Sequence, residues 1–463
     1  MFAASASAQS PANHNLPARL RALVLVLIGS LAQFVHAQDA RAVSEPVLPP
    51  ECTVLAAEFQ APDPLPASDD TQRIQRAIDQ CPIGHAVRLT ATAQQNSFIS
   101  GPLILRSGVS LVVDAGATLY ATPDPHAYDR GQHTCGTNDK SGKGCKPFIT
   151  VDDARGSGIM GLGVIDGQGG HAMSGTGESW WQLSRRAQKE QSTQNVPHLI
   201  VISRSQDFVL YRITLRNSLK FHVVLNQVDG FTAWGVKIDT PADARNTDGI
   251  DPISSRNVTI SNSFIRAGDD NVAIKSGSAG PTENVSILHN HFYSGHGMSI
   301  GSNTDGGIRH VLVDDLSMDG TTSGLRIKSD VSRGGLVTDI HYHNVCLRNV
   351  RAPIDVDTAY DPQAEGDKIP VYSDIFFEHI HSLTPGRIIL KGLGVKHPLR
   401  ASFDDVLIDG SPAIDAIHAR FTLGPGAVRP VPSGSDVQID GKTDHGVGVA
   451  CGLRFPPFPA TTN

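Results

Sequence analysis

Three aspartates and one histidine in the middle of the chain have the types and spacing of an acid–base catalytic group. Asp248, Asp270 and His296 follow one another at intervals of roughly 25 residues, and Asp269 adjoins Asp270. Carboxylates held close together repel and raise each other's pKa, so stability alone would not favour such a group. One carboxyl group can then donate a proton while another accepts one from water. We predict Asp269, Asp248, Asp270 and His296 as catalytic residues, with His296 bonded to an acid.

Two basic residues and a tyrosine follow at comparable intervals. Arg326 follows His296 after a similar stretch of chain, Lys328 lies two positions later, and Tyr360 follows Arg326 after a slightly longer stretch. Residues two apart in a strand face the same way, so the guanidinium and ammonium groups can bind one anion together. Asn246, just ahead of the first acid, is expected to orient a bound hydroxyl or an acid. We predict that these four polar residues bind an acidic substrate.

The intervals between these residues match a sequence repeat. From about residue 200, short runs of alternating apolar residues follow polar turns, and successive starts are roughly 23–35 residues apart. The runs begin at Phe208, Phe231, Val258, Val285, Val311, Ile340 and Ile375. Such a period is typical of a β-solenoid, in which residues one coil apart stack on one face. The sequence predicts an all-β, right-handed parallel β-helix with a small N-terminal capping helix and the ionisable residues in one column.

The chain is expected to have four parts. Residues 1–37 contain two arginines, a short apolar run and an Ala-terminated exit, which predicts a secretory signal peptide. Residues 38–84 form the cap, 85–423 the β-helix, and 424–463 a tail to which the sequence assigns no role. The apolar run is shorter than the roughly 20 residues that span a bilayer. We therefore expect a secreted (extracellular) monomer that has no membrane contact after signal cleavage.

The six cysteines fit an oxidising compartment. Two pairs are expected to form disulfides because their members flank a predicted helix or close a short loop, namely Cys52–Cys81 and Cys135–Cys145. Cys346 and Cys451 either pair or remain as buried thiols. No C-x-x-C spacing occurs, so we predict no zinc site, and no metal or other cofactor.

Four short motifs resemble the signature of one enzyme family. Asn246-Thr-Asp248, Gly268-Asp-Asp270, Gly295-His-Gly297 and Arg326-Ile-Lys328 occur in the order seen in polygalacturonases, glycoside hydrolase family 28. Ile165-Asp-Gly-Gln-Gly-Gly170 is similar to an earlier motif of that family. The longer strings around the four motifs look like those of bacterial secreted endo-acting members. The resemblance covers roughly residues 45–420.

This resemblance implies an endo-polygalacturonase that hydrolyses the α-1,4-galacturonosyl linkages of pectin, a polygalacturonan, with inversion. By similarity, Asp269 is the general acid, Asp248 and Asp270 activate water, and Arg326 and Lys328 bind a substrate carboxylate. A tyrosine in the position of Tyr360 can stack on a sugar ring or donate its hydroxyl to the substrate. Adjacent residues of a strand point to opposite faces, so a turn or bulge must bring Asp269 and Asp270 into one cleft. We also expect the neighbouring carboxylates to raise the pKa of Asp269.

Three other functions remain possible. An exo-polygalacturonase would need loops that close one end of the cleft, and the repeat region carries no long insertion. A calcium-dependent pectate lyase can use the same fold, but needs an acidic calcium site and an arginine base. A non-catalytic β-helix binding protein would not explain the ionisable column. The formal net charge of −7, which becomes −9 when the two arginines of the leader are removed, argues against a nucleic-acid partner.

Overall fold

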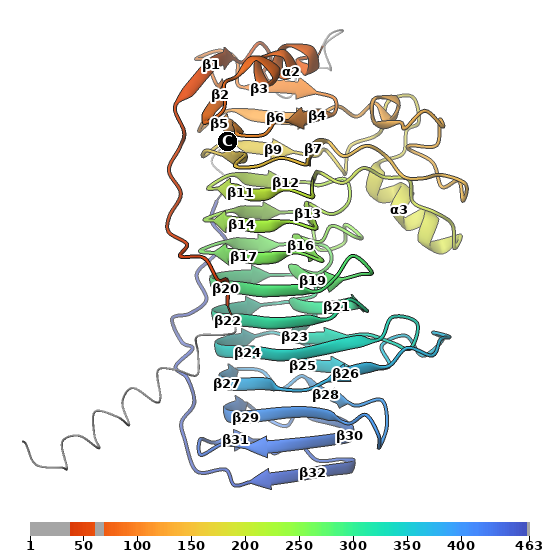
Figure 1. Cartoon of the computed structure of the whole chain (residues 1–463), viewed down its shortest axis with the longest axis vertical. Helices are drawn as coiled ribbons and strands as arrows, with labels where there is room; N and C mark the ends of the chain where they lie inside the picture. The colour runs from red at the N-terminus through yellow and green to blue at the C-terminus, as the bar shows by residue number, and fades with distance from the viewer. Residues whose placement is uncertain (1–37, 61–68, 461–463) are drawn as a thin grey trace, which may run out of the picture. The chain divides into compact units, whose positions relative to one another are not determined.

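The computed structural model describes residues 38–60 and 69–460, so the predicted signal peptide lies outside the described residues. The strands of this region form one 32-stranded sheet, and every pair of named strands is parallel. The chain winds in successive coils, each lying on the one before it (Figure 1). This is the all-β parallel β-helix that the sequence predicts.

Equivalent strands of successive coils form three stacks. The stack that carries the site consists of β4 (Leu103–Leu105), β7 (Ile149–Asp152), β10 (Ile200–Ser203), β13 (Val223–Asn226), β16 (Ile250–Ile253), β19 (Val272–Ser276), β21 (Met298–Thr304), β23 (Ser323–Lys328), β25 (Ala352–Asp357), β28 (Arg387–Lys391) and β30 (Ala413–Leu423). The second begins with β1 (Glu51–Ala56), β2 (His85–Thr90), β5 (Val109–Val113), β8 (Gly158–Met160), β11 (Gln206–Tyr211), β14 (Asp229–Trp234) and β17 (Arg256–Ser261).

The third stack begins with β3 (Ser97–Ser100), β6 (Thr118–Ala121), β9 (Val164–Asp166), β12 (Thr214–Arg216), β15 (Lys237–Asp239) and β18 (Phe264–Arg266). Longer strands then span the second and third stacks, namely β20 (Thr282–Tyr293), β22 (Ile308–Asp319), β24 (Gly335–Arg348), β27 (Ile375–Ser382) and β29 (Leu399–Ile408). The remaining short strands are β26 (Pro370–Tyr372), β31 (Val428–Arg429) and β32 (Ser435–Gly441).

The sequence repeat corresponds to the coil. The seven residues at which the apolar runs begin pair in direct register from one coil to the next, from Phe208 with Phe231 to Ile340 with Ile375. All seven are buried, and the rings of Phe208 and Phe231 stack with an interplanar angle of 3°. The alternation of apolar and polar residues therefore places the apolar side chains on the inner face of each coil, where burial of their surface stabilises the solenoid.

Two helices interrupt the strands. Helix α2 (Thr71–Gln80) lies at the N-terminal end of the solenoid, where it buries Ile74, Ala77 and Ile78, as the predicted cap requires. Helix α3 (Trp180–Lys189) lies in an insertion, residues 171–195, that separates β9 from β10 and adds no strand to the stacks. Its Ser179–Gln182 capping box satisfies the first backbone N–H groups. A short 3-10 turn, η1 (Pro125–Tyr128), lies beside α3, with Tyr128 and Trp180 in edge contact.

The two ends of the described chain both run along one side of the coils, at the left in Figure 1. Near the N-terminus, buried Asp39 accepts a hydrogen bond from Thr259. Near the C-terminus, Tyr293 donates to the carbonyl of Pro456 at 2.7 Å. Strands β31 and β32 lie beyond residue 423, at which the sequence placed the end of the β-helix, and β32 pairs with β30.

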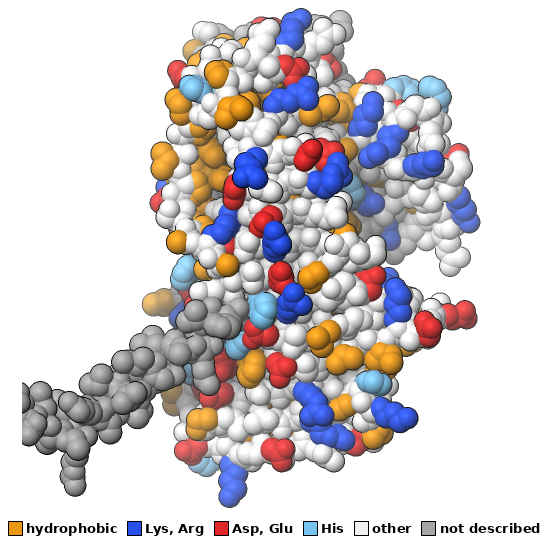
Figure 2. Space-filling model, viewed as in Figure 1, with side chains coloured by type: hydrophobic (Ala, Val, Ile, Leu, Met, Phe, Trp, Pro, Cys, Tyr) orange, Lys and Arg blue, Asp and Glu red, His pale blue; other side chains and the backbone are white. Residues whose placement is uncertain are grey.

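Cross-links join distant parts of the chain. Both expected disulfides are present, and the two remaining cysteines also pair, so the three bonds are Cys52–Cys81, Cys135–Cys145 and Cys346–Cys451. Acidic and basic side chains lie close together over the surface (Figure 2), and many ion pairs join residues one coil apart, such as Arg256 with Asp229. In the part of the chain that the structure describes, no helix has the length and apolar character needed to cross a membrane.

Candidate active site

One cleft of about 770 Å³ brings the predicted site residues together. All eight line it: Asn246, Asp248, Asp269, Asp270, His296, Arg326, Lys328 and Tyr360. The strands that carry, follow or precede them, from β16 to β25, are neighbours in one stack. The expected column of ionisable groups is therefore present, with successive coils about 4.8 Å apart.

The acids and the histidine lie in the turns that lead into β16, β19 and β21, and glycines permit these turns. A Cβ atom on Gly268 would lie 2.0 Å from the carbonyl oxygen of Ala244, so no other residue fits there. Gly297 has a φ of +80°, and its Cβ would meet the carbonyl oxygen of Ser323 at 2.1 Å. The motif glycines are thus needed to stack one turn closely on the next.

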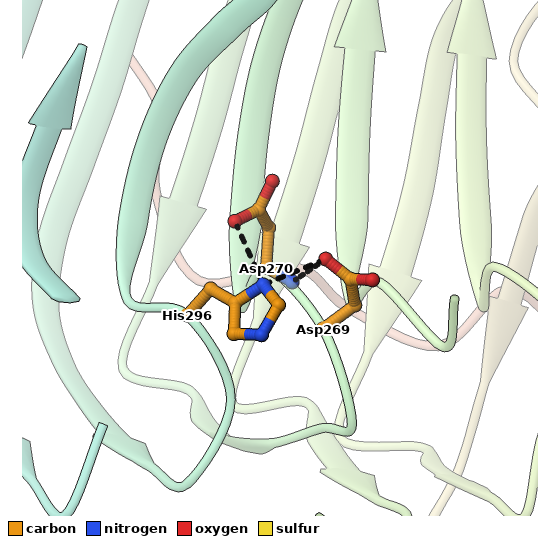
Figure 3. Close-up of side chains that lie close together, drawn as sticks. All are labelled: Asp269, Asp270 and His296. Atoms are coloured by element: carbon orange, nitrogen blue, oxygen red, sulfur yellow. Dashed lines mark hydrogen bonds and ion pairs between the residues drawn. The ribbon is translucent and has the colours of Figure 1, made fainter. Parts of the chain in front are cut away.

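Asp269 and Asp270 both reach the cleft because they precede β19 rather than belonging to it. The imidazole Nδ1 of His296 lies 2.9 Å from Asp269 Oδ1 and 3.8 Å from Asp270 Oδ1 (Figure 3). The expected turn is confirmed. The Asp269 side chain is 18% exposed and that of Asp270 only 2%, so Asp269 is the carboxyl group that a ligand can touch more easily.

Cations and a hydroxyl surround the buried Asp270. Lys328 Nζ contacts Asp270 Oδ2 at 2.8 Å, Arg326 Nη1 lies 3.7 Å from Oδ1, and Ser299 Oγ donates to Oδ1 at 2.7 Å. As expected for residues two apart in β23, both basic groups point into the cleft. Both also lie over the ring of Tyr360, at 5.2 and 5.5 Å from its centroid.

Sequence reasoning missed a buried ion cluster next to Asp248. Lys275 Nζ contacts Asp251 Oδ2 at 2.5 Å and Asp248 Oδ2 at 3.2 Å. Lys275 follows both acids by about one coil of sequence, so the spacing contained the signal. The ammonium group offsets two carboxylates that would otherwise be buried without a counter-ion.

The insertion also reaches the site, which the sequence did not indicate. Gln194 donates to Asn246 Oδ1 at 2.7 Å, and Asn246 Nδ2 donates to Asp269 Oδ2 at 3.2 Å. Asn246 has a φ of +56°, in the left-handed region that asparagine tolerates better than most residues. The predicted role of Asn246 in orienting an acid therefore has a geometric basis.

The pKa values differ from the expectation for Asp269. Burial raises the pKa of Asp269, but the hydrogen bond and charge of His296, together with the charge of Lys328, outweigh burial, so the pKa lies below its ordinary value. Burial and then the charge of Asp251 hold the pKa of Asp248 well above its ordinary value. Burial also raises the pKa of Asp251 to about 6, although Lys275 opposes this. The neighbouring carboxylates thus act mainly on Asp248 and Asp251.

Among the described residues, Asp269, Asp270 and His296 are the one group whose ligand atoms lie close enough to hold a metal ion, within 4.8 Å of one another. Their contacts do not suit calcium. All four carboxylate oxygens already face donors: His296 and Asn246 at Asp269, and Ser299 and Lys328 at Asp270. A divalent cation would have to displace the Lys328 ammonium group, and calcium prefers oxygen ligands without adjacent cations.

Comparisons with known proteins agree with these features. Residues 117–443 match the sequence profile of the family described as "Glycosyl hydrolases family 28". An "Endo-polygalacturonase" of Pectobacterium parmentieri is 48% identical over 390 residues, which cover 84% of this chain and 94% of that protein. A "Polygalacturonase" of Ralstonia nicotianae is 37% identical and covers 94% of this chain and 97% of its own length. The solved polygalacturonase from Erwinia carotovora ssp. carotovora superposes with a TM-score of 0.79 at 46% identity, covering 83% of this chain and all of that one.

Proposed function

The chain belongs to family 28 of the glycosyl hydrolases, and we propose from this premise that it is an endo-polygalacturonase. Its substrate would be polygalacturonan, the unesterified backbone of pectin, and its reaction the hydrolysis of internal α-1,4-galacturonosyl linkages. One observation carries the proposal: three carboxylates and a histidine line the same cleft as Arg326 and Lys328. The first group supplies acid–base chemistry, and the second supplies cations for a substrate in which every sugar is an acid.

Asp269 is the proposed general acid. It is the more exposed of the adjacent pair, so it can reach the glycosidic oxygen, to which it would transfer its proton as the bond to C1 breaks. The bonds from His296 and Asn246 would fix its orientation. A bound uronate would offset the charge of Lys328, which lowers the pKa of Asp269 in the free protein. Substrate binding should therefore raise this pKa and favour the protonated acid.

Asp248 and Asp270 are the proposed residues that activate water. Asp248 lines the cleft, and its Oδ1 has no hydrogen-bond partner among the described residues, so this oxygen can accept a proton from water. The attacking water would add its oxygen to C1 and give its proton to one of these carboxylates. An attack from the face opposite the leaving oxygen inverts the configuration at C1.

Inversion needs a direct test because the acids lie unusually close. Ligand oxygens of Asp269 and Asp270 lie within 4.8 Å, whereas the acid and base of inverting enzymes are commonly about 6.5–9.5 Å apart. The attacking water therefore does not fit on a line between these two groups, which is why we assign Asp248, from the preceding coil, a share in holding it. Proton NMR of the first product should show the β-anomer; an α-anomer would exclude this mechanism.

Analysis of early products from polygalacturonate, with a chelator present, tests the function. Saturated oligomers of mixed length are expected, because the relative with the printed description "Endo-polygalacturonase" covers most of this chain. Monomer or dimer alone would indicate exo-cleavage, and unsaturated products would indicate a lyase. Loss of all cleavage in the chelator would show a metal requirement. We also infer secretion, which agrees with the three disulfides. We infer a monomeric state as well, as for a β-helix whose end is capped.

A further inference from the structure

We propose that Arg185 and Arg245 form a second carboxylate-binding subsite, on the opposite side of the catalytic acids from Arg326 and Lys328. Both guanidinium groups line the cleft, together with Gln188 and the ring of Phe221. The ligand would be the carboxylate of another uronic acid unit in the same polymer, so this inference rests on the proposed function. The subsite would make a charged sugar preferred on each side of the bond that is cleaved.

The order of the coils places the two cationic groups on opposite sides. Phe221 precedes β13, Arg245 precedes β16 and Asp269 precedes β19, and these strands are successive neighbours in register. Arg326 lies in β23, two coils beyond β19 in the other direction. Because coils repeat about every 4.8 Å, Arg245 lies about one coil and Phe221 about two coils before the general acid.

The guanidinium group of Arg245 has no acidic partner of its own. No hydrogen bond or ion pair of its side chain occurs within residues 38–60 and 69–460, although the residue is half-buried. Arg185 donates to the carbonyl of Asp243 at 2.6 Å and forms no ion pair in the same region. Burial lowers the pKa of Arg245, the charge of Asp269 opposes this, and the charge of Arg185 adds to the lowering. Two nearby cations that form no direct ion pair are stabilised when a carboxylate binds to them.

The arginines on the other side of the catalytic acids, in contrast, have acidic partners. Arg326 contacts Asp355 at 3.2 Å as well as Asp270, and Arg387, farther along the cleft, contacts Asp415 at 2.6 Å. The Arg185–Arg245 pair therefore presents more uncompensated positive charge to the cleft than these paired arginines do. This contrast identifies it as a site for an anion rather than as part of a surface ion-pair network.

The floor and wall of the subsite are held in place. The ring of Phe221, which lines the cleft, lies under the ammonium groups of Lys275 and Lys220, at 4.6 and 5.5 Å from its centroid. Helix α3, which carries Arg185 and Gln188, is anchored by the fully buried Trp180. Trp181 also donates to the carbonyl of Ser218, in the turn just before Phe221, at 2.8 Å. The insertion at 171–195 therefore forms one wall of the cleft.

Kinetics with defined substrates test the proposal. Arg245→Gln, Arg185→Gln and the double variant should raise KM for unesterified oligogalacturonides, about 10-fold for Arg245→Gln, with kcat within about twofold, as for loss of a hydrogen bond to a charged group. With highly methyl-esterified pectin, whose carboxylates are mostly neutralised, KM should change much less. Arg245→Lys, which keeps the charge, should recover most of the affinity. The matched control is Arg155→Gln, an exposed arginine outside the cleft.

Two results would overturn the subsite. One is an unchanged KM in a double variant that keeps the wild-type melting temperature. The other is an equal loss on esterified and unesterified substrates, which would indicate a structural role instead of charge recognition. Failure of the proposed function has a different signature, because the wild-type protein would then release no saturated oligomers of mixed length from polygalacturonate.

Discussion

His296 contacts Asp269 through both its side chain and its backbone. Its Nδ1 lies 2.9 Å from the carboxylate Oδ1, and its backbone N–H donates to the Asp269 carbonyl oxygen at 2.9 Å. Two residues from successive turns of the solenoid thus form one rigid unit across neighbouring coils. The bond fixes the acid and holds its pKa below the ordinary value in the free protein.

Asp269→Asn should fold normally and lose most turnover. The amide keeps the shape of the side chain and can still accept a hydrogen bond, but its N–H protons are too weakly acidic to be transferred to the leaving oxygen. We expect kcat to fall by about 10³-fold or more, toward the upper end of the range for general acid catalysis. Reducing-end assays with polygalacturonate measure this loss, and the melting temperature serves as the control. Activity near that of the wild type would refute the assignment of the acid.

His296→Ala should shift the pH profile as well as lower the rate. The imidazole supplies the two largest of the effects that lower the pKa of Asp269, so removing it raises that pKa and the acid stays protonated to higher pH. The alkaline limb of kcat should therefore move upward by a measurable amount. His289→Ala is the matched control, because His289 is an exposed histidine paired with Asp315 outside the cleft. An unchanged alkaline limb would show that His296 does not set the pKa of the general acid.

Lys275→Met should destabilise the protein because it leaves Asp248 and Asp251 buried without a counter-ion. Removing one partner of a buried ion pair typically costs about 3–5 kcal/mol. The loss of stability should be larger at pH 8, where protonating the two buried carboxylates costs more free energy, than at pH 5, where they take up protons more readily. Adding Asp251→Asn to Lys275→Met should recover part of the stability. Urea denaturation of the wild type, the two single variants and the double variant measures the free energy of unfolding of each. A Lys275→Met variant as stable as the wild type would contradict the prediction.

The His343–Asp314 pair should stabilise the fold only in a limited pH window. The hydrogen bond to Asp314, at 2.8 Å, raises the pKa of His343, and the same bond lowers the pKa of Asp314 against the effect of burial. The histidine term is complete below the unfolded pKa of about 6.5 and is lost as pH rises through the raised folded value. The aspartate term is present above about 3.9, the unfolded value, and is lost as pH falls through the lowered one.

His343→Gln should therefore reduce stability by about 0.5–1 kcal/mol near pH 5.5 and by very little at pH 9. Denaturant titrations at the two pH values measure the difference. His445→Gln, which changes an exposed histidine near the C-terminus, is the control and should match the wild type at both. A deficit in His343→Gln that is independent of pH would mean that the side chain acts through packing.

The disulfide between Cys346 and Cys451 should hold the C-terminal segment against the coils. It closes a loop of 105 residues, for which chain entropy predicts a stabilisation of about 4–5 kcal/mol, although measured values are commonly about 2–4 kcal/mol. The double variant Cys346→Ala/Cys451→Ala should melt at a lower temperature and keep its KM, since neither residue lines the cleft. Faster hydrogen exchange should be confined to the C-terminal segment around Pro456, whose carbonyl accepts a hydrogen bond from Tyr293. A changed KM would show that the segment also shapes the site.

The column of site residues followed from the sequence because a solenoid converts sequence interval directly into spatial position. Once Phe208, Phe231 and the later run starts fixed the coil length, residues one coil apart had to stack. The need for a turn at Asp269–Asp270 followed from the alternation of side chains in a strand. These inferences require only local geometry, and the register of the strands confirms them.

The charges that surround each catalytic carboxylate could not be predicted from the sequence in the same way. The sequence indicated that crowded carboxylates would raise the pKa of Asp269, whereas the structure places His296 against Asp269 and leaves Asp248 to face Asp251. Which groups share a cation depends on side-chain directions within each turn. The interval from Asp251 to Lys275 shows that they lie one coil apart, but not that the Lys275 side chain points at Asp251.

The sequence by itself determined the coil, the family and eight of the residues that line the cleft, because motif order and a regular period are properties of the chain alone. Tertiary structure decided which carboxylate meets which cation. It also decided that the insertion at 171–195 turns Arg185 toward the cleft and ties Gln194 to Asn246. An irregular segment has no period from which its position can be read, so only its packing against the coils shows what it contacts.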